Sequence, residues 1–331
     1  MRTIQFREAI CEAMSEEMRR DESVYLMGEE VAEYNGAYKV SQGMLDEFGP
    51  ERILDTPISE AAIVGAAIGA AIDGLIPVAE IMIMDFIGTA ADQLINNAAK
   101  LRFMTAGRTT APITVRTQVY GGLATGATHS QTLEAWFMHI PKIKVIVPAT
   151  PRNGKKLLTS AIFDPDPCLF VETIRLQGQK GLVPTDPGFS IPLGQAEIKR
   201  PGTDVTLISY GRSVHESLAA ATALQEQRVS AEVVDLRTLV PLDIETIVES
   251  VRRTRRAVVA HDAVQFAGPG AEIVATLQSE CFSELAAPIE RVGARFVPTP
   301  AAAALEATIY PSSARIVAAV RRTLEKAGVR G

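Results

Sequence analysis

The sequence has few cysteines and no long hydrophobic run. Its three cysteines, Cys11, Cys168 and Cys281, are far apart and form no Cys-x-x-Cys pair. This spacing argues against a disulfide framework or a structural zinc site, and it fits a reducing cytoplasm. The longest apolar stretch, residues 61–72, is followed by Asp73 and is well short of the ~20 residues that a membrane-spanning helix needs. We therefore expect a cytoplasmic protein with no membrane-spanning segment.

The sequence also lacks an excess of basic residues. Lys and Arg number 33 against 39 Asp and Glu, which gives a net charge of −6. A protein that binds duplex nucleic acid needs basic surface to neutralise phosphates, so a nucleic-acid partner is not expected. The length of 331 residues exceeds the roughly 250–300 at which single hydrophobic cores stop growing, which favours two domains.

Helical and strand patterns alternate along the whole chain, which is typical of an α/β fold with largely parallel sheets. The patterns predict an opening helix over residues 6–20, a second over 61–72 with Ser59 as its cap, and a long one over 89–103. A stretch rich in Gly and Pro interrupts the alternation and reads as a linker. We expect two Rossmann-like, three-layer domains at residues 1–180 and 203–331, joined by a linker at 181–202.

Residues 60–73 combine an acid with a stripe of small side chains. Ala61, Gly65, Gly69 and Asp73 recur every four residues and so share one face of the predicted helix. Such a stripe allows another backbone to approach closely, although packing of the helix on a sheet would explain it equally well. Glu60 begins this apolar helix, where a carboxylate is either a simple cap or a poorly solvated acid that needs a partner.

A series of long blocks resembles the β subunits of thiamine-diphosphate-dependent 2-oxo acid dehydrogenase complexes, which act on pyruvate, branched-chain 2-oxo acids or acetoin. The resemblance implies a transketolase-like fold with a pyrimidine-binding domain and a transketolase C-terminal domain. The blocks span nearly the whole chain in order: TPISE (56–60), PVAEIMIMDF (77–86), ADQLINNAAK (91–100), HSQTLEAWFMHIP (129–141), KVIVPATP (144–151), GTDVTLISYG (202–211) and AEVVDLRTLVPLD (231–243).

The resemblance implies roles for four residues. Glu60 would hydrogen-bond N1′ of the cofactor's aminopyrimidine ring, which needs a carboxyl group in a dry pocket. Phe86 would pack against the pyrimidine face, and Glu29 would lie near the cofactor pocket. Without the family, Phe86 reads equally well as a core residue at a strand end, and Glu29 reads as a helix cap or a solvated acid.

His129 would help acyl transfer to a lipoyl thiol. A single histidine is most often structural, but His129 lies in a loop bordered by Gly, Thr and Ser after a predicted strand, where functional residues concentrate. An imidazole that titrates near neutral pH can accept or deliver a proton.

Two nucleotide-binding patterns are missing from the sequence. No Gly-x-Gly-x-x-Gly follows a predicted strand, which leaves a nicotinamide site without support. No Gly-Asp-Gly is followed some 25–30 residues later by Asn, the pattern that binds Mg²⁺ and diphosphate in this superfamily; Asp73-Gly74 lacks the first Gly. The resemblance implies that an α subunit holds the diphosphate and Mg²⁺, in a heterotetramer of two α and two β subunits that share thiamine diphosphate.

A segment at the end of a predicted helix aligns with one that binds K⁺ through backbone carbonyls in some relatives. The residues concerned are Ala161, Ile162, Asp164 and Asp166. A helix C-terminus followed by a turn that contains proline explains the same residues without an ion.

Several positions depart from the family pattern, among them Asn153, Gln177 and His261-Asp262. The last pair lies in the domain that docks a dihydrolipoyl acyltransferase core in relatives, so a free-standing enzyme stays open. Pyruvate is the expected substrate by family abundance. Alternatives are acetoin, which TQVYGG (117–122) also resembles, a branched-chain 2-oxo acid, a transketolase-like carboligase without a lipoyl carrier, and a non-catalytic scaffold.

Overall fold

The computed structural model describes residues 1–186 and 190–325, and the chain forms two compact units. The first contains residues 1–120 and 128–193; the second contains residues 121–127 and the described residues from 194 onward. Part of the expected linker, residues 187–189, and the end of the expected second domain, 326–331, lie outside the described residues.

A parallel sheet forms the centre of the first unit. Six of its strands lie in the order β6-β7-β5-β4-β2-β3, and every neighbouring pair is parallel. A separate antiparallel pair joins β1 (Arg2–Gln5) to β8 (Lys180–Val183). The six strands are β2 (Val24–Gly28), β3 (Ile53–Asp55), β4 (Ile76–Ile81), β5 (Thr114–Val119), β6 (Lys144–Ile146) and β7 (Cys168–Thr173).

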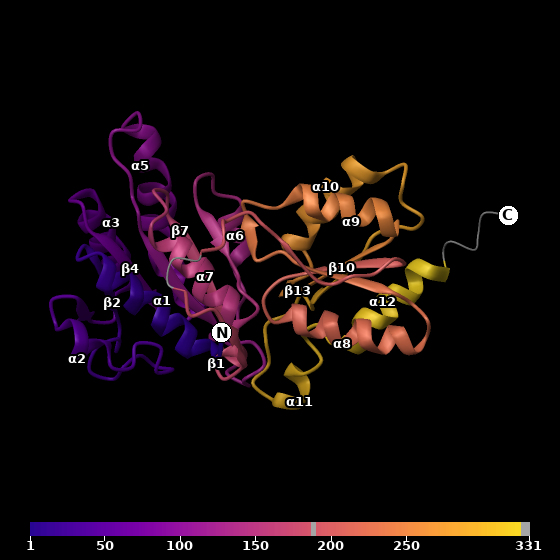
Figure 1. Cartoon of the computed structure of the whole chain (residues 1–331), viewed down its shortest axis with the longest axis horizontal. Coiled ribbons are helices and arrows are strands. Elements are labelled where there is room, and N and C mark those ends of the chain that lie inside the picture. The colour runs from indigo at the N-terminus through magenta and orange to yellow at the C-terminus, as the bar shows by residue number, and fades with distance from the viewer. Residues whose placement is uncertain (187–189, 326–331) are drawn as a thin grey trace. The chain divides into compact units, whose positions relative to one another are not determined.

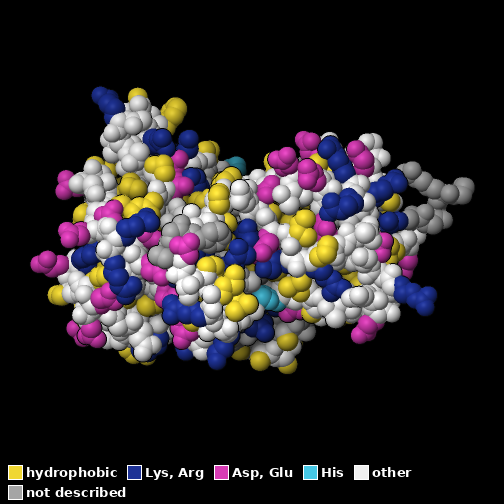
Figure 2. Space-filling model, viewed as in Figure 1, with side chains coloured by type: hydrophobic (Ala, Val, Ile, Leu, Met, Phe, Trp, Pro, Cys, Tyr) yellow, Lys and Arg dark blue, Asp and Glu magenta, His cyan; other side chains and the backbone are white. Residues whose placement is uncertain are grey.

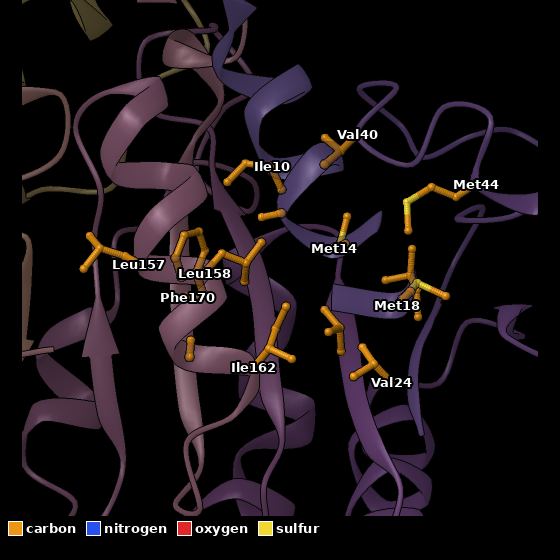
Figure 3. Close-up of a cluster of buried hydrophobic side chains, with 14 of the residues drawn as sticks. Ile10, Met14, Met18, Val24, Val40, Met44, Leu157, Leu158, Ile162 and Phe170 are labelled. Atoms are coloured by element: carbon orange, nitrogen blue, oxygen red, sulfur yellow. The ribbon is translucent and has the colours of Figure 1, made fainter. Parts of the chain in front are cut away.

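Helices cover both faces of this sheet. On one face α1 packs against α7, and their apolar side chains meet those of β2 and β7 in one core (Figure 3). The prediction of a helix over residues 6–20 is confirmed. The helices of the first unit are α1 (Phe6–Arg20), α2 (Met44–Phe48), α3 (Glu60–Ile72), α4 (Ile87–Asp92), α5 (Ala99–Met104), α6 (Glu134–Met138) and α7 (Pro151–Ile162).

Helix α3 packs on β4. The face that packs lies opposite to part of the stripe formed by Ala61, Gly65, Gly69 and Asp73. Its buried side chains are Ile63, Val64, Ala67, Ile68 and Ala71, none of which belongs to the core between α1 and α7. A Cβ added at Gly69 would meet open space. Helix-on-sheet packing therefore explains the apolar face of α3 but not Gly69.

Helix α3 begins after the predicted cap residue. The Ser59 carbonyl accepts the first helical hydrogen bond from Ile63 N–H at 2.9 Å, so Ser59 is the cap residue. Its hydroxyl makes no capping hydrogen bond, however. The prediction of Ser59 as the cap residue is confirmed, and the carboxylate of Glu60 is the acidic group in the first turn.

The long helix expected over residues 89–103 is present but is not uniform. Helices α4 and α5 are joined by a π-helical turn, Gln93–Ala98. The Gln93 side chain lies close to the face of Gly65, where an added Cβ would be 3.5 Å from its Oε1. Turns of this kind are frequent at functional sites and cannot be read from hydrophobic period alone.

Among the described residues, the central sheet of the second unit has five strands in the order β14-β13-β10-β11-β9, with helices on both faces (Figure 1). Helices α8 and α12 pack together, as do α9 and α10. Strand β9, within the stretch expected as a linker, pairs antiparallel with β11. The elements are β9 (Glu197–Arg200), β10 (Val205–Ser209), α8 (Ser213–Glu226), β11 (Ala231–Asp235), β12 (Thr238–Val240), α9 (Ile244–Thr254), β13 (Ala257–Val264), α10 (Pro269–Cys281), β14 (Glu290–Ala294), α11 (Ala303–Glu306) and α12 (Ser313–Glu325).

A fully buried histidine supports the start of α10. His261 Nε2 accepts from Gly270 N–H at 3.1 Å, and its Nδ1 lies 3.0 Å from the Ala263 carbonyl oxygen. The imidazole therefore satisfies a helix N-terminal donor as a neutral ring. Burial lowers the pKa of His261 to about 4, although the Ala263 carbonyl acts in the opposite direction.

Among the described residues, none of the helices combines the length and the apolar character needed to cross a bilayer. On the face shown in Figure 2, Lys and Arg side chains are interspersed with Asp and Glu side chains.

Candidate active site

The four site residues expected from the sequence follow four neighbouring strands of the first unit. Glu29 follows β2, Glu60 begins the helix after β3, Phe86 lies after β4 and His129 after β5. These strands are adjacent in the order β5-β4-β2-β3 and run parallel, so all four residues lie along one edge of the sheet. Open α/β sheets bind their ligands at this carboxyl edge.

Thr89 links Glu60 to Phe86. Its Oγ1 lies 3.1 Å from Glu60 Oε2 and 2.8 Å from the carbonyl oxygen of Phe86. A hydroxyl carries a single proton and can donate to only one of these oxygens at a time, while its lone pairs can accept. The Thr89 hydroxyl therefore lies between the Glu60 carboxyl and the Phe86 carbonyl.

The imidazole of His129 lies against the ring of Phe86. The ring centroids are 5.4 Å apart and the planes are inclined at 79°, a T-shaped pair. The Thr128 hydroxyl is 2.9 Å from His129 Nδ1. The loop is fixed further by Asp85, whose Oδ1 accepts from the Gln131 side-chain amide at 3.0 Å. Phe86 is thus half-buried beside the site rather than a simple core residue.

Glu29 is neither a helix cap nor a solvated acid. It lies in a turn after β2 and is only 9% exposed. Burial raises the pKa of the Glu29 carboxyl, and the negative charges of Glu60, Glu80 and Glu30 raise it further. The effect of Glu60 on this pKa means that the two acids lie at the same part of the sheet edge.

A buried ion-pair network, not anticipated from the sequence, crosses the sheet. Arg116 in β5 lies between Glu80 in β4 and Glu172 in β7, at N–O distances of 2.7 and 2.6 Å. The Gln177 side chain donates to Glu172 at 2.7 Å, so this departure from the family pattern has a structural role. Burial raises the pKa of Glu80 against the effect of Arg116. Burial acts to lower the pKa of Arg116, but Glu172 and Glu80 outweigh it and leave that pKa raised.

Two tyrosines lie near the same strands. Tyr38 and Tyr120 form a T-shaped pair with centroids 5.5 Å apart, and both pack with Ile83 in a small cluster that Phe86 adjoins. Burial, with a smaller effect of Glu80, raises the pKa of Tyr38 to about 12. No sequence motif marked these tyrosines, because only the fold brings residues 38 and 120 together.

The segment considered for K⁺ ends α7. Both of its carboxylates already have cationic partners: Asp164 pairs with Lys144, and Asp166 pairs with Arg102 at 3.1 Å. The Ala161 carbonyl oxygen accepts from Asp164 N–H at 3.1 Å. An ion at this place would therefore be bound by main-chain carbonyls at the helix C-terminus. Within residues 1–186 and 190–325, no cluster of three or more His, Cys, Asp or Glu side chains is arranged to hold a metal.

This chain alone does not enclose the Glu60 carboxyl. Glu60 is partly exposed, and Ala61, Ala62 and Ala66 beside it are exposed. Ile58, two residues before Glu60, is 81% exposed. Large apolar residues exposed on or beside α3 and α5 are Ile72, Leu75, Phe103 and Met104. Exposed apolar surface of this kind is typical of a site where another chain binds.

Comparison with known proteins matches each of the two units to a transketolase domain family. Residues 2–178 match the family described as transketolase, pyrimidine binding domain, and residues 194–316 match transketolase, C-terminal domain. A solved structure described as a split gene transketolase, inactive beta4 tetramer, superposes with a TM-score of 0.77 at 23% identity, and covers 97% of this chain and 98% of its own. The fold therefore defines a transketolase-like protein, as predicted.

Relatives with curated names identify the family within this class of transketolase-like proteins. The chain is 45% identical over 97% of its length to the pyruvate dehydrogenase E1 component subunit beta-2, mitochondrial, of Oryza sativa, covering 86% of it. It is 43% identical to the E1 component subunit beta of Rhizobium meliloti and to that of Rickettsia felis, covering 71% and 98% of them. The chain belongs to the family of pyruvate dehydrogenase E1 component β subunits.

Proposed function

We propose that this chain, together with an α subunit, decarboxylates pyruvate oxidatively and passes the acyl group to a lipoyl carrier. The observation that carries the proposal is the grouping of Glu60, Phe86 and His129 at one sheet edge, joined through Thr89 and the T-shaped ring pair. A scaffold protein has no need of this grouping. The high identity to E1 β subunits over nearly the whole chain supports the same activity.

The sheet edge fits the pyrimidine half of thiamine diphosphate. The Glu60 carboxyl is available to hydrogen-bond N1′, and the half-buried Phe86 ring offers an apolar surface beside it. Glu29 lies close enough to Glu60 that the charge of Glu60 raises the pKa of the Glu29 carboxyl. When bound, the cofactor supplies a thiazolium ring that stabilises the carbanion left by decarboxylation. Glu60 would hold or move the proton at N1′, and Phe86 would keep the ring in place.

The α subunit would bind the diphosphate and Mg²⁺, in a heterotetramer of two α and two β subunits. The exposed apolar residues on α3 and α5 and the open side of Glu60 support a second chain at this surface. We further propose K⁺ on the main-chain carbonyls near Ala161 and Ile162, with Asp164 and Asp166 held in place by Lys144 and Arg102.

His129 would assist the transfer of the acyl group. Its ring is partly exposed and its Nδ1 lies 2.9 Å from the Thr128 hydroxyl. An imidazole at this place would accept or deliver a proton as the acyl group passes to a lipoyl thiol. A dihydrolipoyl acyltransferase core would supply that thiol. The three free cysteines support a reducing compartment, and we propose the cytoplasm, although the Oryza relative is described as mitochondrial.

Glu60→Gln in the complex reconstituted with the α subunit tests the proposal. Gln keeps the size of the side chain but cannot accept or release a proton, so decarboxylation of pyruvate should fall by about 10²–10⁴-fold. Assembly, measured by analytical ultracentrifugation, should be unchanged. Glu51→Gln, an exposed acid of the same unit, is the matched control. Retained turnover in Glu60→Gln would contradict the proposal, and a panel with acetoin and branched-chain 2-oxo acids separates the substrate alternatives.

A further inference from the structure

A glycine-rich segment leads directly into the site histidine. Residues 121–127 connect Tyr120, one residue after β5, to Thr128 and His129. Three of its residues have left-handed backbone conformations: Gly122 at φ 91°, Ala124 at φ 58° and Gly126 at φ 80°. Alternation of this kind turns successive backbone N–H groups towards a common side, where they form a concave donor site for an anion.

The side chain of Glu306 occupies that donor site. Glu306 ends the short helix α11 and is 2% exposed. Its Oε1 accepts from Gly122 N–H at 2.8 Å and its Oε2 accepts from Ala124 N–H at 2.6 Å. Both oxygens of the buried Glu306 carboxylate thus accept hydrogen bonds from the same short segment. These two hydrogen bonds make Glu306 an anchor of this turn.

Two further contacts hold the segment to the region around Glu306. A Cβ at Gly121 would lie 2.7 Å from Cζ of Tyr310, so the ring of Tyr310 packs directly on the backbone of Gly121. Gly126 lies against Ala301, at 3.5 Å from an added Cβ. Burial raises the pKa of Tyr310 to about 12, and its hydroxyl lies 3.5 Å from that of Thr299. The segment is therefore in contact with residues 301–310 near both of its ends.

We propose that Glu306 is a positioning residue for His129, which deepens the proposed function and rests on the role given there to His129. The imidazole is five residues beyond Ala124, the second backbone group that Glu306 holds. Without the Glu306 carboxylate, the left-handed turn loses the two hydrogen bonds to Gly122 and Ala124. The backbone that leads from this turn to Thr128 and His129 is then no longer fixed. Misplacement of a reacting group by about 1 Å can lower a rate by about 10²-fold.

The first measurement is hydrogen–deuterium exchange over residues 120–130 in the complex with the α subunit. Glu306→Gln keeps one acceptor oxygen and Glu306→Ala keeps none, so exchange should rise about tenfold in the first variant and further in the second. Glu249→Gln, an exposed acid in the middle of α9, should leave exchange over this segment unchanged. Unchanged exchange in both Glu306 variants would overturn the proposal.

The second measurement separates a positioning role from a purely structural one. Acylation of a lipoyl domain should fall more than decarboxylation followed with an artificial electron acceptor, in Glu306→Gln as in His129→Ala. Gly121→Ala, which pushes the segment away from Tyr310 without touching Glu306, should give the same selective loss and guards against a folding defect of the Glu306 variants. Equal losses in the two assays for Glu306→Gln and Gly121→Ala would overturn the proposal.

The two proposals fail in different ways. A selective loss in His129→Ala that is missing from Glu306→Gln would overturn only the positioning role of Glu306. A His129→Ala variant without a selective loss would overturn the role of His129 and the inference that rests on it.

Discussion

The ring of Phe86 meets the imidazole of His129 edge to face, with centroids 5.4 Å apart. The two residues come from loops after neighbouring strands β4 and β5, and Asp85 ties these loops together through Gln131. An apolar ring that would contact a bound pyrimidine is thereby in contact with the imidazole that would assist acyl transfer. A change in either residue should affect the other's position.

His129→Ala should impair acylation of a lipoyl domain by about 10²-fold or more, the usual range for a lost general acid or base. Decarboxylation followed with an artificial electron acceptor should fall much less, because the role proposed for His129 is in acyl transfer and that proposed for Glu60 is in activation of the cofactor. His139→Ala, an exposed histidine after α6, is the control and should behave as the unmodified chain does. Equal losses in both assays would show that His129 acts before acyl transfer.

Arg116→Met should destabilise the first unit by about 3–5 kcal/mol, since it leaves Glu80 and Glu172 buried without their shared cation. Chemical denaturation at pH 7 measures the change. Arg19→Met removes an exposed pair with Glu47 and should lower the free energy of unfolding by less than about 1 kcal/mol. Similar effects of the two substitutions would mean that the buried network contributes little to stability.

The second unit should lose stability when the pH falls from 6.5 to 4. The pKa of His261 is lowered from 6.5 to about 4 in the folded chain, so the unfolded chain binds the proton first and is favoured in this range. A difference of about 2.5 pH units corresponds to about 3 kcal/mol. His261→Asn should unfold with a smaller dependence on pH, even though Gly270 N–H loses its acceptor at every pH. The same slope in both proteins would contradict this account of His261.

Local patterns predicted two of the helices closely. The amphipathic pattern predicted α1 with its observed bounds, Phe6–Arg20, and the helix expected over residues 61–72 is α3, Glu60–Ile72. The π-helical turn Gln93–Ala98 was missed because it depends on how α4 and α5 pack beside α3. Ser59 is the cap residue of α3 as predicted from its residue type, although its hydroxyl makes no capping hydrogen bond.

The site was predicted only in part. Glu60, Phe86, Glu29 and His129 came from residue patterns and the family resemblance. Their supporting contacts did not, because those contacts join positions remote in sequence: Thr89 and Glu60 are 29 residues apart, and Gln131 and Asp85 are 46 apart. The spacing of hydrophobic residues along the sequence carries no information about such pairs. Glu306 had no signal at all, since an acid in a short helix has no motif that marks it as an anchor for a distant loop.

The central claim is that this chain provides one half of an active site. The most direct test measures pyruvate decarboxylation by the purified chain with thiamine diphosphate and Mg²⁺, first alone and then with the α subunit. We predict no turnover by the chain alone and full turnover after the α subunit is added. Turnover by the chain alone, at the rate of the complex, would contradict the claim.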